Sequence, residues 1–192
     1  MKKNATKQEI TSKGPRIAPL RSFIFILLAA GLVALDQLTK TRVLANETLM
    51  AGGEIALIPN LFSLRYTFNT GAAWSILADQ TWGIYLLSGI SAVASLVFLI
   101  LLIKRSGWPV FLPLSLTMVL AGAAGNLIDR FYLGGVVDFF DFFYGDWHFP
   151  TFNVADSLIT VGVIFLMIYL IFFEEKHRER FLKEQKNKIR PL

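Results

Sequence analysis

Long apolar runs constrain this chain more than any other feature. A helix of about 20 residues crosses the ~30 Å hydrocarbon core of a bilayer, so an uncharged run of that length predicts a membrane span. Three runs reach this length: Thr81–Ile103, Trp108–Ile128 and Phe152–Phe173. The first two contain no charged residue and the third contains only Asp156. Composition agrees, because only 17% of the residues are charged, against about 25% in a soluble domain.

A fourth span is predicted near the N-terminus, where Ser22–Leu35 is apolar and the run reaches spanning length when extended to Leu44. A basic start before a short apolar run is also typical of a secretory signal peptide. Three further spans follow here instead of a soluble domain, so we expect the segment to be retained. The sequence predicts an all-α membrane protein, a four-helix bundle. Its spans are expected at about 22–44, 81–103, 108–128 and 152–173, between basic tails over 1–21 and 174–192.

Positive charge is distributed unevenly between the connections. The two tails and the link after the second span hold 15 of the 19 Lys and Arg residues. Cytoplasmic segments of membrane proteins are enriched in these residues, so both termini are expected in the cytoplasm and two loops, about 45–80 and 131–151, outside. Charges clumped between uncharged runs indicate a membrane rather than nucleic acid as the partner. Residues 174–190 predict either an amphipathic helix on anionic lipid or a charged helix extending the fourth span.

The two outward loops carry different patterns. From Leu61 to Asn69 apolar and polar residues alternate, which predicts a strand in a small sheet at the outer membrane surface. The second loop is rich in aromatic residues, which favour the membrane–water interface: Phe131, Tyr132, Phe139, Phe140, Phe142, Phe143, Tyr144, Trp147 and Phe149. We expect most of them to anchor the protein there, and as a group they would also suit an acyl-bearing ligand.

Polar residues gather at the outward ends of the spans. They are Asp36, Lys40, Asn126, Asp129, Arg130 and Asp156. A charge at the centre of a span opposes insertion by ~2.5–3.5 kcal/mol, so a charge within a span predicts a functional role. The shared depth of these residues favours chemistry at the outer leaflet over conduction through the bilayer. Asp36 and Lys40 are one helical turn apart, so we expect an ion pair between them.

Two carboxylates flank the second loop. Asp138 and Asp156 are 18 residues apart, so the loop can return one to the other. Carboxylates that meet in a poorly hydrated site do not easily both ionise, and the pair then supplies a general base and a general acid. The chain has no Cys and only two His residues, which excludes a Cys nucleophile, thiolate metal sites and a His-rich metal site. Asp141 and Asp146 are rival carboxylates that we expect to be solvated.

Five segments resemble, in order, the signature boxes of the bacterial lipoprotein signal peptidase (signal peptidase II) family. They read DQLTK over 36–40, NTGAAWS over 69–75, AGAAGNLIDR over 121–130, GVVDF over 135–139 and FNVADS over 152–157. The resemblance covers about residues 20–175. It implies an intramembrane aspartic endopeptidase of the bacterial inner membrane that cuts signal peptides from diacylglyceryl-modified prolipoproteins, before the lipidated cysteine and at the outer face.

The resemblance also assigns roles to residues. It implies that Asp138 and Asp156 are the catalytic pair. The residues that it implies bind substrate or support the pair are Asn69, Asn126, Arg130, Asn153, Ala155, Asp36, Lys40 and Asp129. It implies a diacylglyceryl prolipoprotein substrate, contact with membrane lipid, inhibition by macrocyclic peptides such as globomycin, and neither a metal nor a cofactor. We expect a monomer that binds no nucleic acid.

Four other functions are compatible with parts of the sequence. A proton or cation transporter would use the same carboxylates as an ion relay. A Ser/Lys peptidase would combine Ser157 or Ser75 with Lys40. A metallopeptidase would need Asp138, Asp141 and His148 as ligands. A membrane scaffold without activity would have no use for paired carboxylates.

Overall fold

The computed structural model describes residues 18–71 and 82–189. Its four long helices are each long and apolar enough to cross a membrane: α2 (Pro19–Leu44), α4 (Gly83–Arg105), α5 (Phe111–Leu133) and α6 (Val154–Phe172). This confirms the predicted fold class. Parts of the sequence predictions lie outside the described residues. They are most of the N-terminal tail, the end of the first outward loop with the signature-box residues 72–75, Thr81 at the predicted start of the second span, and residues 190–192 of the C-terminal tail.

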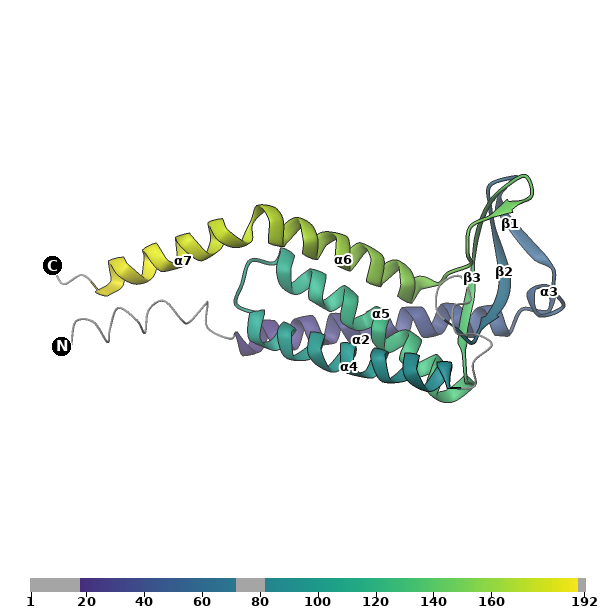
Figure 1. The fold of residues 1–192 in the computed structure, drawn as a ribbon, viewed down its shortest axis with the longest axis horizontal. Coiled ribbons are helices and arrows are strands. Elements are labelled where there is room, and N and C mark those ends of the chain that lie inside the picture. The colour runs from purple at the N-terminus through teal and green to yellow at the C-terminus, as the bar shows by residue number, and fades with distance from the viewer. Residues whose placement is uncertain (1–17, 72–81, 190–192) are drawn as a thin grey trace.

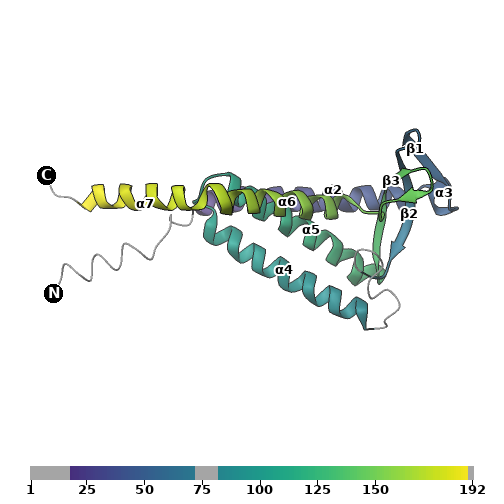
Figure 2. The ribbon, with the colours of Figure 1, turned by 45° about the horizontal axis from the view of Figure 1, so that its top comes forward.

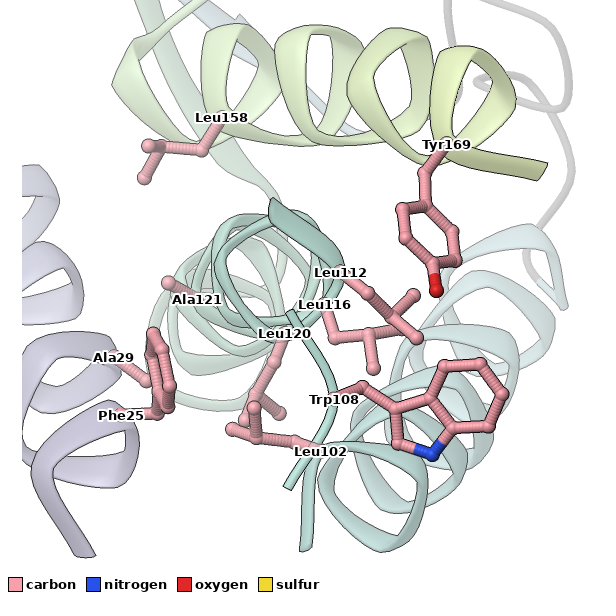
Figure 3. Packing of buried hydrophobic residues seen from close by; sticks show 10 residues of the cluster. All are labelled: Phe25, Ala29, Leu102, Trp108, Leu112, Leu116, Leu120, Ala121, Leu158 and Tyr169. Carbon is pink, nitrogen blue, oxygen red and sulfur yellow. The ribbon is translucent and has the colours of Figure 1, made fainter. Parts of the chain in front are cut away.

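Helix α5 is the centre of the bundle and lies between α4 and α6 in both views (Figures 1 and 2). In its most apolar stretch 67% of the residues are buried, against 6% for α4, 17% for α6 and 22% for α2. The other three helices therefore turn apolar side chains outward, as helices in contact with lipid do. Leu116, Leu120 and Ala121 of α5 pack with Phe25 of α2 and Leu158 of α6 in the core (Figure 3).

Small residues allow α5 and α6 to approach closely. A β-carbon added at Gly122 would collide with the carbonyl oxygen of Ala155 and lie 3.1 Å from the backbone nitrogen of Ile159. Small residues at such positions let membrane helices pack backbone to backbone. The run of Gly and Ala before Asn126 thus holds the two helices that carry much of the polar cluster together.

We expect Gly122→Ala to destabilise the protein by about 1–3 kcal/mol, because the extra carbon forces α5 and α6 apart. Gly89→Ala on α4 is the matched control, since a β-carbon there meets no atom within 4 Å. Thermal unfolding in detergent measures both. Equal melting temperatures for the two variants would contradict the close approach at Gly122.

A four-stranded antiparallel sheet caps one end of the bundle (Figure 1). Its strands follow the order β1 (Glu54–Ile58), β2 (Phe62–Asn69), β3 (Val136–Tyr144) and β4 (Trp147–His148), and the short helix α3 (Glu47–Met50) precedes it. The strand predicted from Leu61 is confirmed as β2. In the register of β2 with β3, Thr67 lies opposite Asp138 and Asn69 opposite Val136.

The aromatic segment 131–151 connects the third and fourth spans as expected, and most of it forms the strands β3 and β4. Helix α5 continues to Leu133, and β3 follows after two glycines. The first four residues of β3 are buried, and two of them, Val137 and Phe139, pack in one apolar cluster with Val43 of α2 and Leu49 of α3. The aromatic residues therefore divide: Phe139 is buried, whereas Phe131, Tyr132 and Tyr144 are among the most exposed side chains and remain suited to the membrane interface.

Helix α7 (Glu174–Ile189) follows α6 after a break at Phe173. Figure 1 shows α7 running away from the bundle in nearly the direction of α6. This arrangement agrees with the second of the two alternatives, a charged helix that extends the fourth span.

Candidate active site

Asp138 lies in the buried part of β3, with 2% of its surface exposed. Each of its carboxylate oxygens accepts a hydrogen bond from an amide. The Asn153 side chain donates to Oδ1 at 2.7 Å, and the Asn69 side chain donates to Oδ2 at 3.0 Å. Neighbouring strand β2 therefore supplies one donor, and the segment that enters α6 supplies the other.

Asp156 lies in the first turn of α6, and Asn153 is the N-cap of that helix. The two residues form a capping box: the Asn153 Oδ1 accepts from the Asp156 N–H at 2.9 Å, and the Asp156 Oδ2 accepts from the Asn153 N–H at 3.1 Å. Such a box satisfies two backbone donors that the helix itself leaves free. The Asn126 side chain donates to the other oxygen, Oδ1, at 2.8 Å.

Asn153 thus contacts both carboxylates. Its side-chain amide binds Asp138 while its backbone N–H binds Asp156. Asn153 is fully buried and also donates to the Asn126 Oδ1 at 3.1 Å. The chain therefore returns Asp156 to the neighbourhood of Asp138, and the return is made by the helix cap.

A network of buried charged side chains supports both carboxylates. Lys40 of α2 lies 2.9 Å from an oxygen of Asp36, 2.9 Å from an oxygen of Asp129 and 3.0 Å from the Asn126 Oδ1. The expected Asp36–Lys40 ion pair is confirmed, and Asp129 is a second partner. All three charged side chains are at least 97% buried.

The network also reaches the two elements that carry Asp138 and Asp156. The Asp36 Oδ1 accepts from the Ala155 N–H at 2.9 Å, which fixes the start of α6. The Asp129 Oδ2 accepts from the Val137 N–H at 3.1 Å, which fixes the start of β3. A carboxylate at a helix N-terminus is additionally stabilised by the helix dipole.

Gln37 was not singled out in the sequence, although it lies in the first signature box. Its amide donates to the Asp129 Oδ1 at 2.8 Å and to the Gly125 carbonyl at 3.2 Å. Its position between Asp36 and Lys40 could have identified it as part of the polar cluster, because a polar residue inside a span predicts a buried partner.

Burial, followed by the neighbouring charge of Asp156, raises the pKa of Asp138 to about 7. The hydrogen bonds from Asn69 and Asn153 and the charge of Lys40 oppose this increase by stabilising the ionised form. A carboxyl group with this pKa exchanges its proton near neutral pH, as a general acid or base must.

A cavity of about 950 Å³ opens between the sheet and the ends of α5 and α6 that lie next to it. Both carboxylates line it, together with Asn69, Asn126 and Arg130. Much of the remaining wall is apolar and comes from β2, the segment before α6, and α6 itself: Phe68, Phe149, Phe152, Ile159 and Val161. The cavity therefore combines the two carboxylates with an apolar wall that is suited to a hydrocarbon chain.

Arg130 lies one turn beyond Asn126 on α5 and faces this cavity. Its Nη1 donates to the Ser91 hydroxyl of α4 at 3.2 Å and approaches the Asn126 carbonyl at 3.5 Å. Its buried Nε has no hydrogen-bond partner within the part of the chain that the structure describes. Arg130 thus retains a donor nitrogen that these contacts do not use.

Asp141 is not solvated, which corrects the sequence prediction. It is fully buried in β3 and lies 3.0 Å from the His148 Nδ1 and 3.6 Å from the Arg65 Nε. The sheet explains this burial, because β2 and β4 flank Asp141 and carry the two basic partners. Asp146, in the turn before β4, is exposed as expected.

The alternative functions find little support in this geometry. Over residues 18–71 and 82–189 no group of three or more metal-ligating side chains converges, and Asp141 pairs with His148 rather than with Asp138. Lys40 contacts two carboxylates, while the Ser157 hydroxyl donates to the Asn153 carbonyl at 2.9 Å; Ser75 lies outside the described residues. The core below the site is apolar, unlike the acidic relay of an ion transporter.

Fold and site together define a membrane protein with a carboxylate pair facing a cavity at one end of a four-helix bundle. Residues 28–172 match the family described as Signal peptidase (SPase) II, and this chain belongs to that family. It is 40% identical over 164 residues to a lipoprotein signal peptidase of Coxiella burnetii (strain Dugway 5J108-111), covering 84% of this chain and 95% of the relative. A lipoprotein signal peptidase of Symbiobacterium thermophilum is 42% identical over 151 residues, covering 79% and 96%.

Solved structures agree with the family assignment. One bacterial membrane enzyme superposes with a TM-score of 0.70 at 30% identity, over 93% of this chain and 98% of the solved chain. The chain is therefore a protease that removes signal peptides from lipoproteins, and a multi-pass protein of the bacterial inner membrane.

Proposed function

We propose that this protease is an aspartic endopeptidase in which Asp138 and Asp156 are the catalytic pair. The observation that carries the proposal is that both carboxylates bind Asn153 and face one cavity at one end of the membrane helices. We further propose that both tails are cytoplasmic, with a catalytic membrane domain over 22–173 between them. The sheet and the cavity then lie at the outer face.

The proposed reaction is addition of water to a peptide carbonyl. The ionised member of the pair takes a proton from water as the water oxygen bonds to the carbonyl carbon, and the protonated member donates to the carbonyl oxygen. The tetrahedral intermediate then collapses, a carboxyl group protonates the amide nitrogen, and the C–N bond breaks. The signal peptide leaves with a new carboxyl group, and the mature chain keeps a free amino group. The reaction uses neither a metal nor a cofactor.

The asparagines hold the pair in position during this reaction. Asn69 and Asn153 fix the plane of the Asp138 carboxyl, and Asn126 fixes Asp156. The free donor of Arg130 would bind a carbonyl of the substrate backbone, because a guanidinium group offers donors in a fixed plane.

The substrate proposed for the cavity is a prolipoprotein whose cysteine carries diacylglycerol, cut just before that cysteine. Apolar side chains such as Phe149, Phe152 and Val161 form a wall for its acyl chains. Macrocyclic peptides such as globomycin would occupy the same cavity and compete with it. One chain supplies every residue proposed for the site, so we propose a monomer that contacts membrane lipid and binds no nucleic acid.

The experiment that tests this function is cleavage of a synthetic precursor peptide by the purified protein in detergent. We expect the diacylglyceryl-modified peptide to be cut before its cysteine, and the unmodified peptide to be cut far more slowly. Cleavage at another bond, or equal rates for the two peptides, would contradict the proposed substrate.

The pKa of Asp138 predicts how cleavage depends on pH. The pair loses its shared proton above about pH 7, so kcat/KM should fall up to about tenfold for each further pH unit. Asn69 lowers this pKa by binding the ionised form, so Asn69→Ala should move the fall in kcat/KM to higher pH. Asn46→Ala, which removes the cap of α3, is the control and should leave the profile unmoved. A shift to lower pH in Asn69→Ala would contradict the role of Asn69.

A further inference from the structure

Helix α4 has three serines, and their hydroxyl groups form hydrogen bonds with different partners. The Ser88 hydroxyl donates to the Ile84 carbonyl at 2.7 Å, and the Ser95 hydroxyl donates to the Ser91 carbonyl at 2.8 Å. Both bonds stay within the helix, as is common for serine in an apolar helix. Ser91 differs, because its hydroxyl oxygen accepts from the Arg130 Nη1 of α5 at 3.2 Å.

The hydrogen bond between Ser91 and Arg130 is unusual for α4. This helix buries only 6% of its most apolar stretch, the smallest share among the four long helices, so most of it is suited to lipid. Ser91 nevertheless lies half-buried beside α5 and reaches a guanidinium group that lines the cavity. A helix whose surface is mostly exposed thus contacts the site through one hydroxyl group.

The geometry of Arg130 explains what this hydroxyl does. A guanidinium group is planar, so fixing one of its nitrogens limits the directions in which the others point. Ser91 holds Nη1, while the buried Nε has no partner among the described residues. Without Ser91, the hydrogen bonds of Arg130 within the described residues would be reduced to the long contact of Nη1 to the Asn126 carbonyl, at 3.5 Å.

We propose that Ser91 is a positioning residue that orients Arg130 toward the substrate backbone. The inference rests on the proposed function, because it takes the substrate carbonyl as the acceptor for Arg130. Ser91 itself touches neither carboxylate in the structure, so its effect should fall on substrate binding rather than on the proton transfers.

The test compares three alanine variants of the full chain in the lipidated-peptide assay. We expect Ser91→Ala to lower kcat/KM about three- to tenfold, the effect of losing one ordinary hydrogen bond, mainly through a higher KM. Ser88→Ala and Ser95→Ala, whose hydroxyls bind only their own helix, should stay within about twofold of the unmodified protein. Ser91→Thr keeps the hydroxyl and should recover most of the loss. Equal losses in the three alanine variants would show a general effect of α4 and overturn the proposal.

A second measurement separates positioning from packing. In an Asp156→Asn background, which should bind but not cut, we expect Ser91→Ala to weaken binding of the lipidated peptide. Adding Arg130→Gln should remove that difference, because Ser91 then has no guanidinium group to orient. An undiminished effect in the Arg130→Gln background would overturn the proposal. If the unmodified protein binds the peptide but does not cut it, the proposed reaction fails, and this binding comparison still decides the role of Ser91.

Discussion

Replacing either Asp138 or Asp156 by Asn should reduce cleavage of the lipidated peptide by at least about 10³-fold, the order of effect expected of acid–base catalysis. Asn has nearly the same size as Asp but neither takes a proton from water nor supplies one to a carbonyl. Both side chains lie in amide-rich surroundings, so the protein should still fold. Cleavage rates and thermal unfolding of the same purified samples check the two parts of this expectation.

Two other aspartates of the sheet region are matched controls. Asp146→Asn changes an exposed carboxylate and should leave cleavage unaltered. Asp141→Asn changes a buried carboxylate that pairs with His148 and Arg65, so it should cost stability and leave the catalytic pair intact. A variant of Asp138 or Asp156 with full activity would show that the reaction does not use the pair.

Replacing Lys40 by Met should destabilise the protein by about 3–5 kcal/mol, because it leaves two carboxylates buried without their cation. Lys40 is 97% buried and lies 2.9 Å from both Asp36 and Asp129. Since these carboxylates hold the starts of α6 and β3, the same change should also lower activity. Thermal unfolding in detergent measures the loss of stability.

The charge balance of this network supplies the control. Combining Lys40→Met with Asp129→Asn restores the net charge of the cluster, so the double variant should be more stable than Lys40→Met alone. Lys104→Met at the exposed end of α4 should change stability by no more than about 0.5 kcal/mol. A double variant less stable than the single one would indicate that lost hydrogen bonds, rather than unbalanced charge, dominate.

The spans and the Asp36–Lys40 pair were predictable because each depends on local sequence. Lipid requires a run of apolar residues long enough to cross it, and one helical turn brings positions four apart together. Strand β2 was predictable for the same reason, since its apolar–polar alternation is local, although the polar Ser63 is buried and the apolar Phe68 is exposed. The N-cap role of Asn153 could also have been found, because Asn153 and Asp156 have the spacing of a capping box.

The pairing of strands in the sheet could not be predicted from local patterns in the sequence. Strand β3 begins with four buried residues, Val136 to Phe139, and therefore lacks the alternation that identified β2. The burial of Asp141 depends on its register opposite Ser63 and on His148 from the next strand. The contact from Ser91 to Arg130 likewise depends on which face of α4 meets α5. These features follow from contacts between segments distant in sequence.

Infrared spectroscopy of the purified protein tests the shared proton of the pair most directly. We expect a carboxylic-acid C=O band that persists above about pH 5, where exposed carboxyl groups are ionised, and disappears with a midpoint near the Asp138 pKa of about 7. The band should be missing from Asp138→Asn at the same pH. A spectrum without any such band between about pH 5 and pH 7 would mean that both carboxylates are already ionised, and would contradict a pair that acts as acid and base together.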